Sequence, residues 1–427
     1  MKIPAKDWFR PRTYLHFDLP INIKKASKIV YSPDLVAKHA FYPLINYTIE
    51  VNKIGKDPIT KTVINLPSKL RPISYPAHVD SHIYAYYSKL LNREYEKKLR
   101  SNELHDSILA FRSLGKSNID FAFDAFNEIK KTGECCAIAL DVSKFFDTLD
   151  HEVLKREWCN LLGVSRLPKD HFNVFKSITK HSIVEKEALY KSLGISLNYR
   201  NHARRRVCEP LEFRENVRKN KLIKTHKQLY GIPQGTPLSA MLSNIYMFEF
   251  DLKMRQFVNS LSGKYFRYCD DMLFIVPIEA KAIIEQYAMT QIQSLKLKVN
   301  PKKTEVRTFV FNGSELNSDS HLQYLGFMFN GKDIFIRSSS LARYSERMRR
   351  GVRLAKKTML KYNNLRLING QKERPLFKRK LYSRYTHLGK RNFITYGIRA
   401  ANTMDSESIR RQLKPLLKRF KDEVNKT

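Results

Sequence analysis

Three aspartates stand in sequence settings that suit metal-dependent chemistry. Asp141 closes a short apolar run, and Asp270 and Asp271 are neighbours between two apolar segments. A buried carboxylate is costly unless it is paired, and adjacent carboxylates repel each other unless a cation lies between them. Two Mg²⁺ ions about 4 Å apart can activate a 3′-hydroxyl and stabilise departing pyrophosphate. One such Asp alone is more readily a turn residue or a helix cap, but the three together predict two-metal nucleotidyl transfer, with Mn²⁺ as a substitute for Mg²⁺.

Strands must bring these acids together. The run 135–142 (CCAIALDV) predicts a buried strand, and 264–276 (KYFRYCDDMLFIV) predicts a β-hairpin whose turn carries Asp270 and Asp271. The remaining pattern predicts helices over 79–99, 151–162, 237–250 and 279–295, and short strands over 296–299, 306–311 and 322–329. This order indicates an α+β palm. Basic helices, broken near Pro375 and Gly389, are expected beyond Ser338.

The charge of the chain points to a polyanionic partner. Lys and Arg number 78 against 41 Asp and Glu, a formal net charge of +37. About half of this excess lies in residues 341–427, which hold 25 Lys and Arg and 6 Asp and Glu. A chain this basic usually binds nucleic acid, and the cations are not confined to one amphipathic helix as they would be for a membrane surface.

Other classes of protein fit the composition poorly. Hydrophobic residues make up 42% of the chain, which is enough for a substantial core and excludes a disordered polyelectrolyte. No apolar run is long enough to span a membrane, and the first residues lack the apolar stretch of a secretion signal. The five cysteines show no paired spacing, which favours a reducing cytoplasm.

Seven segments in order resemble the motifs of reverse transcriptases. They are 69–73 (KLRPI), 110–112 (AFR), 140–147 (LDVSKFFD), 231–239 (GIPQGTPLS), 267–271 (RYCDD), 297–304 (LKVNPKKT) and 324–327 (YLGF). Their order and content resemble the group II intron, retron and related bacterial lineages over roughly residues 60 to 340. The resemblance implies a right-hand polymerase with fingers, a palm made of an antiparallel sheet with packed helices, and a helical thumb.

The resemblance also implies roles for individual residues. Asp141, Asp270 and Asp271 would be the metal ligands, together with the Val142 carbonyl. Lys303, with Lys302 as the second choice, would protonate the pyrophosphate.

The implied nucleotide site involves five further residues. Phe146 would act as the steric gate against a 2′-hydroxyl, Gln234 would contact the incoming dNTP, and Gly235 would allow close approach of the backbone. Lys69 and Arg71 would hold the triphosphate. Without the family resemblance, these residues have ordinary structural interpretations. Phe146 is equally a core aromatic, and Gln234 would cap a turn. Lys302 and Lys303 would form a solvated basic face.

The resemblance divides the chain into five parts. These are an N-terminal region with fingers (1–135), the first part of the palm (136–165), an insertion (166–229), the catalytic second part of the palm (230–337) and a basic thumb (338–427). The thumb cations expected to track a template–primer or a bound RNA are Arg343, Arg347, Arg349, Arg350, Arg353, Lys356 and Lys357. The aromatics that follow, among them Tyr385 and Phe393, are expected mainly to pack the thumb.

About 90 residues follow the palm, which suits a thumb but leaves no room for an RNase H domain or a large endonuclease. This architecture resembles defence-associated bacterial reverse transcriptases, above all the type 2 class, which works with a dedicated structured non-coding RNA. The expected function is therefore RNA-directed synthesis of cDNA from dNTPs in anti-phage defence. A template-independent DNA polymerase of the abortive-infection type and a non-catalytic RNA-binding scaffold stay open, although intact acids argue against the scaffold. RNA-dependent RNA synthesis is disfavoured by Phe146.

Overall fold

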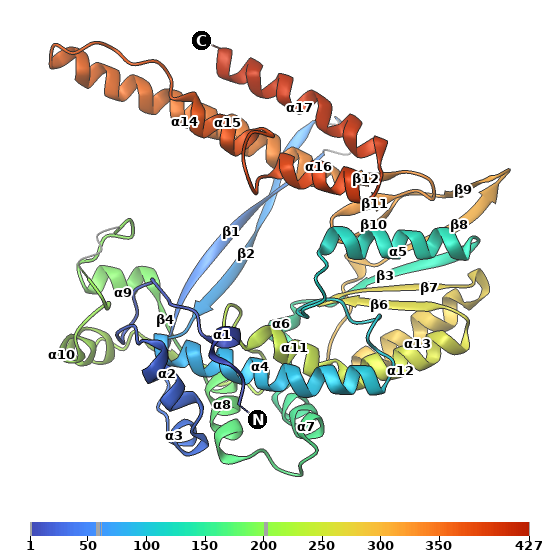
Figure 1. The fold of residues 1–427 in the computed structure, drawn as a ribbon, viewed down its shortest axis with the longest axis horizontal. Coiled ribbons are helices and arrows are strands. Elements are labelled where there is room, and N and C mark those ends of the chain that lie inside the picture. The colour runs from blue at the N-terminus through green and yellow to red at the C-terminus, as the bar shows by residue number, and fades with distance from the viewer. Residues whose placement is uncertain (1, 57–59, 61, 200–203, 427) are drawn as a thin grey trace.

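A five-stranded antiparallel sheet carries the predicted acids and lies at the right of the molecule in Figure 1. In a computed structural model, which describes residues 2–56, 60, 62–199 and 204–426, its strand order is β6-β7-β3-β8-β9. The strands are β3 (Cys135–Asp141), β6 (Lys264–Tyr268), β7 (Asp271–Val276), β8 (Glu305–Asn312) and β9 (Glu315–Ser318). Helices pack on this sheet, so the predicted α+β fold class is confirmed.

The two faces of this sheet are covered by different helices. Cys136, Ile138 and Leu140 of β3 join the largest core, which also takes residues from helices on one face. Those helices are α4 (His78–Ser101), α7 (His151–Leu162), α11 (Ser239–Tyr246), α12 (Phe248–Ser260) and α13 (Lys281–Ser294). Cys135 and Ala137 point the other way, into a second core with α5 (Asn118–Thr132). The near-continuous apolar run of β3 follows from burial on both faces.

A long two-stranded ribbon crosses the molecule toward the C-terminal helices (Figure 1). It consists of β1 (Leu44–Lys56) and β2 (Val63–Tyr75), which pair antiparallel. At its base β1 pairs in parallel with β4 (Ser182–Glu185), which pairs with β5 (Ile223–Thr225). The backbone N–H of Ser74 in β2 also donates to the carbonyl of Gln234 at 2.7 Å, which ties the ribbon to the palm.

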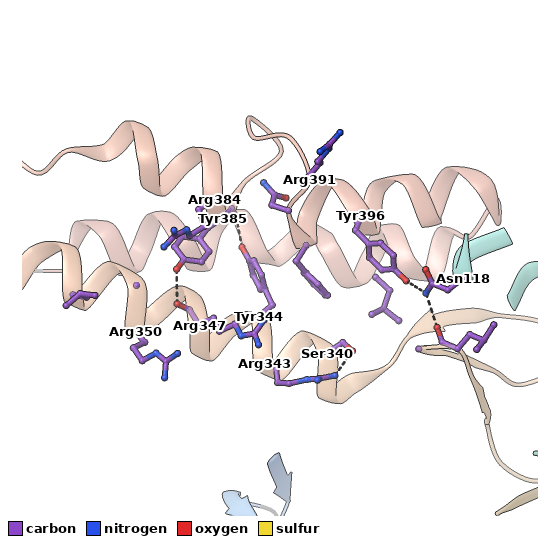
Figure 2. Close-up of a pocket in the computed structure, with 17 residues that line it drawn as sticks. Asn118, Ser340, Arg343, Tyr344, Arg347, Arg350, Arg384, Tyr385, Arg391 and Tyr396 are labelled. Atoms are coloured by element: carbon purple, nitrogen blue, oxygen red, sulfur yellow. Dashed lines mark hydrogen bonds between the residues drawn. The ribbon is translucent and has the colours of Figure 1, made fainter. Parts of the chain in front are cut away.

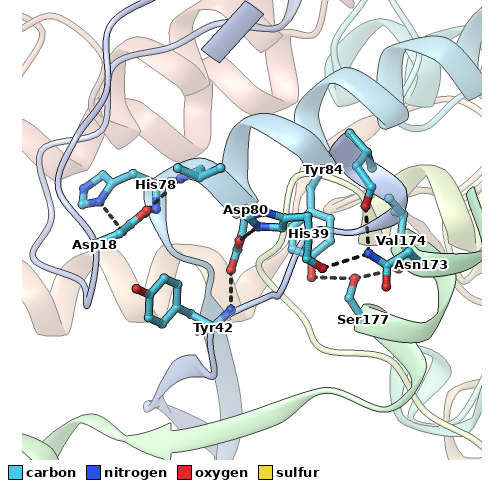
Figure 3. Close-up of polar contacts among 11 residues, drawn as sticks. Asp18, His39, Tyr42, His78, Asp80, Tyr84, Asn173, Val174 and Ser177 are labelled. Carbon is cyan, nitrogen blue, oxygen red and sulfur yellow. Dashed lines mark hydrogen bonds and ion pairs between the residues drawn. The ribbon is translucent and has the colours of Figure 1, made fainter. Parts of the chain in front are cut away.

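The N-terminal segment is fastened to α4 and α8 (Lys169–Thr179) by buried polar contacts (Figure 3). The Asp18 carboxylate accepts hydrogen bonds from the backbone N–H groups of His78 and Val79, both at 2.9 Å, and so caps α4 from a distance. Asp80 contacts His39 Nε2 at 2.6 Å and accepts from the Tyr42 N–H at 2.9 Å. The short helices α1 (Ala5–Trp8), α2 (Ile23–Val30) and α3 (Pro33–Ala37) lie in this segment.

Residues of the predicted insertion share a small core with the N-terminal segment and β1. Val184, Leu189, Val207 and Val217 are buried there together with Phe17 of the N-terminal segment. Its further elements are α9 (Lys186–Ser192), the short α10 (Pro210–Glu212) and a π-helical turn over Phe213–Arg218.

The C-terminal part is helical, as the basic pattern predicts. It comprises α14 (Ser338–Ile368), α15 (Lys378–Tyr385), α16 (Phe393–Thr403) and α17 (Glu407–Asn425), with breaks that contain Pro375 and Gly389. A small sheet of β10 (Leu322–Tyr324), β11 (Phe327–Phe329) and β12 (Ile334–Ile336) leads into it. Within the residues described, none of these or the other helices is both long and apolar enough to cross a membrane.

Three local predictions were wrong. The expected single strand over 322–329 is a hairpin, because Leu325 and Gly326 adopt positive φ between β10 and β11. The expected helix over 237–250 is two helices that meet at Met247. Residues 296–299 form no strand beyond a bridge between Val299 and Val142. The other predicted helices and strands, including 79–99, 151–162 and the hairpin over 264–276, are confirmed within a few residues.

Candidate active site

The sheet register places the predicted acids together. Asp141 is the last residue of β3 and Asp271 the first of β7, and the antiparallel pairing sets them directly opposite each other. Asp270 precedes Asp271 in the turn, and its carbonyl accepts a hydrogen bond from the Val142 N–H at 3.3 Å. All three carboxylates line one cavity of about 860 Å³.

The electrostatics of this cavity suit a divalent cation. Burial, followed by repulsion from Asp270 and Asp141, raises the pKa of Asp271 to about 7. Bound cations would relieve that repulsion, and carboxylate oxygens are the ligands that Mg²⁺ prefers. Among the described residues no three metal-binding side chains are already gathered at ligand distance, but Mg²⁺ needs only one or two carboxylates beside substrate phosphates. The Val142 carbonyl follows directly on Asp141 in the chain.

Lys303 reaches the same site from the segment after α13. Its Nζ lies 2.7 and 2.6 Å from the two carboxylate oxygens of Asp141, while about half of its side chain stays exposed to solvent. The ammonium therefore balances the charge of the buried Asp141 carboxylate. The side chain of Lys302, the alternative donor, lies outside the described residues.

Two cations predicted to hold a triphosphate line the cavity from the ribbon. Lys69 and Arg71 lie on β2, opposite Val51 and Ile49 of β1. Burial, with Lys303 and Arg71 nearby, lowers the pKa of Lys69. Cations from the ribbon thus face the acids of the palm across one cavity, an arrangement suited to an anionic substrate that bridges them.

The other three predicted nucleotide-site residues lie near one another and are not among the described residues that line this cavity. The carbonyl of Phe146 accepts from the Ile232 N–H at 2.8 Å, and Gln234 Nε2 donates weakly to Asp147 at 3.4 Å. Gly235 has a φ of 108°, and a Cβ there would lie 2.6 Å from the Ser74 carbonyl. Only glycine therefore fits where this loop meets β2.

Comparison with known families agrees with this geometry. The family described as reverse transcriptase (RNA-dependent DNA polymerase) matches residues 54–329, well over half of the chain. The chain belongs to the reverse transcriptase family. The enzyme class expected from the acids and motifs, an RNA-directed DNA polymerase, is the class that this family's description names.

Solved structures similar to this reverse transcriptase include two yeast telomerases. Apo telomerase from Candida tropicalis, truncated from its C-terminal domain, is 13% identical with a TM-score of 0.43, over 74% of this chain and 61% of that one. Telomerase from Candida albicans in complex with a fragment of telomeric RNA is 13% identical with a TM-score of 0.41, over 94% and 64% of the two chains. This chain thus spans less than two thirds of either relative.

The thumb of this reverse transcriptase contains a second cavity, of about 820 Å³ (Figure 2). Of the predicted thumb cations, Arg343, Arg347 and Arg350 line it, and no acid is found among the described residues of its lining. Arg384 of α15 and Arg391 of the loop before α16 also line this cavity. The sequence did not predict them as part of it, because nothing in their spacing places them beside α14. The cavity shares Asn118, Leu325, Gly326 and Arg343 with the cavity of the acids.

The remaining predicted thumb cations lie elsewhere on α14. Arg349, Arg353, Lys356 and Lys357 do not line the cavity, and Lys356 Nζ donates to the Glu423 carbonyl of α17 at 3.0 Å. The aromatics serve mainly in packing. Tyr344, Tyr385 and Phe420 belong to the thumb core, where the Tyr344 hydroxyl donates to the Tyr385 carbonyl at 2.6 Å.

Proposed function

We propose that this protein is an RNA-directed DNA polymerase that copies a structured RNA into cDNA from dNTPs. The observation that carries the proposal is the single cavity in which Asp141, Asp270 and Asp271 face Lys69 and Arg71. An anionic nucleotide can contact both sets of charges there.

The acids of the palm would hold two Mg²⁺ ions, or Mn²⁺ in their place, with the Val142 carbonyl as an additional ligand. When bound, such ions activate the 3′-hydroxyl and offset charge on the transferred phosphate. The protein's own contribution is to place the substrate. Lys69 and Arg71 would bind the triphosphate, and Lys303 would give a proton to the departing pyrophosphate.

The nucleic-acid duplex would leave the acids along α14, because Arg343 of that helix lines both the cavity of the acids and the cavity of the thumb. Arg343, Arg347 and Arg350 would contact its phosphates. Arg353, Lys356 and Lys357 would add to the basic field around α14.

Primer extension by the purified protein tests the activity. With an RNA template, a DNA primer, dNTPs and Mg²⁺, we expect templated cDNA. The double variant Asp270→Ala with Asp271→Ala should lose about 10³-fold or more of the rate, because the metal ligands are removed. Asp319→Ala, at an exposed acid of the palm, should keep the wild-type rate.

Sequencing the product separates the alternatives, since a random sequence would indicate template-independent synthesis. No synthesis at all, with RNA still bound, would favour a scaffold.

The motif resemblance supports a narrower proposal. We propose a bacterial enzyme of the type 2 defence-associated class, active in the cytoplasm against phage. Cells that carry the gene and its RNA should resist phage, and the Asp270→Ala, Asp271→Ala variant should restore plaques to control numbers. Sequencing of RNA and DNA that co-purify with the protein would identify the template. Full protection by the inactive variant would refute a role for cDNA.

A further inference from the structure

Arg267, the first residue of the RYCDD motif, is completely buried behind the catalytic turn. Its guanidinium makes a paired contact with the Asp251 carboxylate, Nε to Oδ1 at 2.7 Å and Nη2 to Oδ2 at 2.5 Å. Its Nη1 donates to the Cys269 carbonyl at 3.1 Å and to the Asn244 side-chain oxygen at 3.2 Å. The side chain thus reaches back into the turn of its own hairpin.

The residues that hold Arg267 come from several parts of the palm. Asp251 lies on α12 and also accepts from the Tyr265 hydroxyl at 2.8 Å. Asn244 lies on α11, and its Nδ2 donates to the Ala110 carbonyl at 3.0 Å.

The backbone of Arg267 is fixed as well. Its N–H donates to the Ser107 carbonyl at 2.8 Å, and its carbonyl accepts from the Leu109 N–H at 2.9 Å. The guanidinium therefore has little freedom to move.

The Cys269 carbonyl that Arg267 holds belongs to a residue in an uncommon conformation. Cys269 has a φ of 61°, which is unfavourable for a residue with a Cβ. The orientation of the next peptide, and with it the direction of Asp270 and Asp271, depends on this conformation. A charge-assisted hydrogen bond to the Cys269 carbonyl stabilises it.

Resting on the polymerase function proposed above, we propose that Arg267, oriented by Asp251 and Asn244, is a positioning residue that fixes the Cys269 peptide and thereby the two turn carboxylates. Its effect reaches the reaction through the geometry of the acids, since its guanidinium touches neither of their carboxylates in any described contact. Loss of the Cys269 contact should weaken Mg²⁺ binding and slow the chemical step while leaving template–primer binding unchanged.

Removal of Arg267 alone would leave the Asp251 charge buried and unpaired, so two other variants are better tests. Arg267→Lys keeps a cation beside Asp251, but one ammonium cannot make the forked contact with Asp251 and still reach the Cys269 carbonyl. The triple variant Arg267→Met, Asp251→Leu, Tyr265→Phe removes the buried charges together with the hydroxyl that would lose its acceptor. Both variants give up the contact with Cys269.

The readouts are kcat, the Mg²⁺ concentration for half-maximal rate, and the Kd of a template–primer. For both variants we expect kcat to fall, and the Mg²⁺ requirement to rise, by about 10- to 100-fold, as is typical when the support of a metal ligand is removed. The Kd should stay at the wild-type value, and higher Mg²⁺ should restore part of the rate.

Tyr87→Phe is the matched control, because it removes a buried hydrogen bond to Asp170, at 2.5 Å, that does not involve the turn. It should change thermal stability without changing the Mg²⁺ requirement. A folded variant of either kind with wild-type kcat and Mg²⁺ dependence would overturn the proposal. If the triple variant does not fold, Arg267→Lys decides alone. An inactive wild-type protein would instead refute the polymerase function itself.

Discussion

The position of Phe146 offers a test of substrate choice at the scale of one residue. Its ring packs at the edge of the main core, and its carbonyl accepts from the Ile232 N–H of the GIPQG loop. If the ring blocks a ribose 2′-hydroxyl, Phe146→Ala should raise rNTP incorporation relative to dNTP by about 10- to 100-fold, since a steric pocket of this kind discriminates by that much. The measurement is the ratio of kcat/KM for matched rNTP and dNTP on one template.

Phe146→Tyr is the control, because it keeps a ring of similar size and should retain discrimination. The same rNTP preference in wild type and in Phe146→Ala would show that Phe146 is only a core aromatic.

The residues that touch substrate were easier to predict than those that support them. Asp141, Asp270 and Asp271 were recognisable because each carries charge within an apolar context, and strand pairing then brings them together. Arg267 and Asp251 are 16 residues apart in the chain and meet only because α12 packs beside β6. Arg384 and Arg391 join Arg347 only through the packing of the thumb helices. The spacing of residues along the chain does not predict such contacts.

At the scale of elements, the start of α4 depends on a residue 60 positions away. Asp18 accepts from the N–H groups of His78 and Val79, two of the groups that a helix leaves without partners at its start. Burial alone would raise the pKa of Asp18, but these hydrogen bonds and the His78 side chain lower it. Asp18→Ala should therefore reduce the free energy of unfolding by about 2 kcal/mol.

Chemical denaturation checks the loss, and hydrogen exchange at His78 and Val79 should become faster in the variant. Asp34→Ala, which removes an exposed acid from the first turn of α3, should have a much smaller effect. Equal losses in the two variants would argue against capping by Asp18.

The same helix should make stability depend on pH. Burial, with Arg12 and His78 nearby, lowers the pKa of His82 to about 4, whereas an unfolded chain would hold a proton on it below about 6.5. The unfolded state therefore binds more protons between these values, so stability is complete above pH 6.5 and falls as the pH drops toward 4. At pH 5 the loss from His82 should be about 2 kcal/mol.

His82→Phe keeps a ring to stack on Phe9, 4.7 Å away, but cannot take up a proton. Thermal unfolding is measured at a series of pH values between about 7.5 and about 4.5. As the pH falls, the melting temperature should drop less steeply for His82→Phe than for wild type. Tyr84→Phe, which removes a buried hydroxyl that does not titrate in this range, should lower stability without changing the slope. Parallel curves for wild type and His82→Phe would contradict the assignment.

Elements with a strong period were predictable, and the exceptions have physical causes. The helices over 79–99 and 151–162 were evident because their apolar residues repeat at helical spacing. The hairpin over 322–329 looked like one strand because its turn is only two residues long and one of them, Leu325, is itself apolar. The ribbon of β1 and β2 was not predicted, because Pro43 just before β1 and Pro67 and Pro72 within β2 argue against long strands.

At the scale of the whole molecule, the fold shows where the excess positive charge lies. The excess of Lys and Arg after residue 341 falls on the thumb, and five of its arginines line the cavity that adjoins the acids. Burial, with Arg337, Arg347 and Arg71 nearby, lowers the pKa of Arg343. Cations held this close repel one another, so the unbound protein maintains a local field that a phosphate backbone would neutralise.

This field predicts how nucleic-acid binding responds to salt. Each phosphate neutralised releases bound counterions, so the logarithm of the association constant falls with the logarithm of salt concentration, by about 0.7 to 0.9 per contact. The triple variant of Arg343, Arg347 and Arg350 to Gln should therefore reduce that slope by about 2 to 3 for a template–primer. A matched variant, with Lys24, Lys25 and Lys28 of α2 changed to Gln, loses the same charge from an exposed surface of the N-terminal segment. If the salt dependence of binding falls equally in the two variants, the thumb arginines contribute only overall charge. If it falls only in the thumb variant, the phosphate contacts lie on α14.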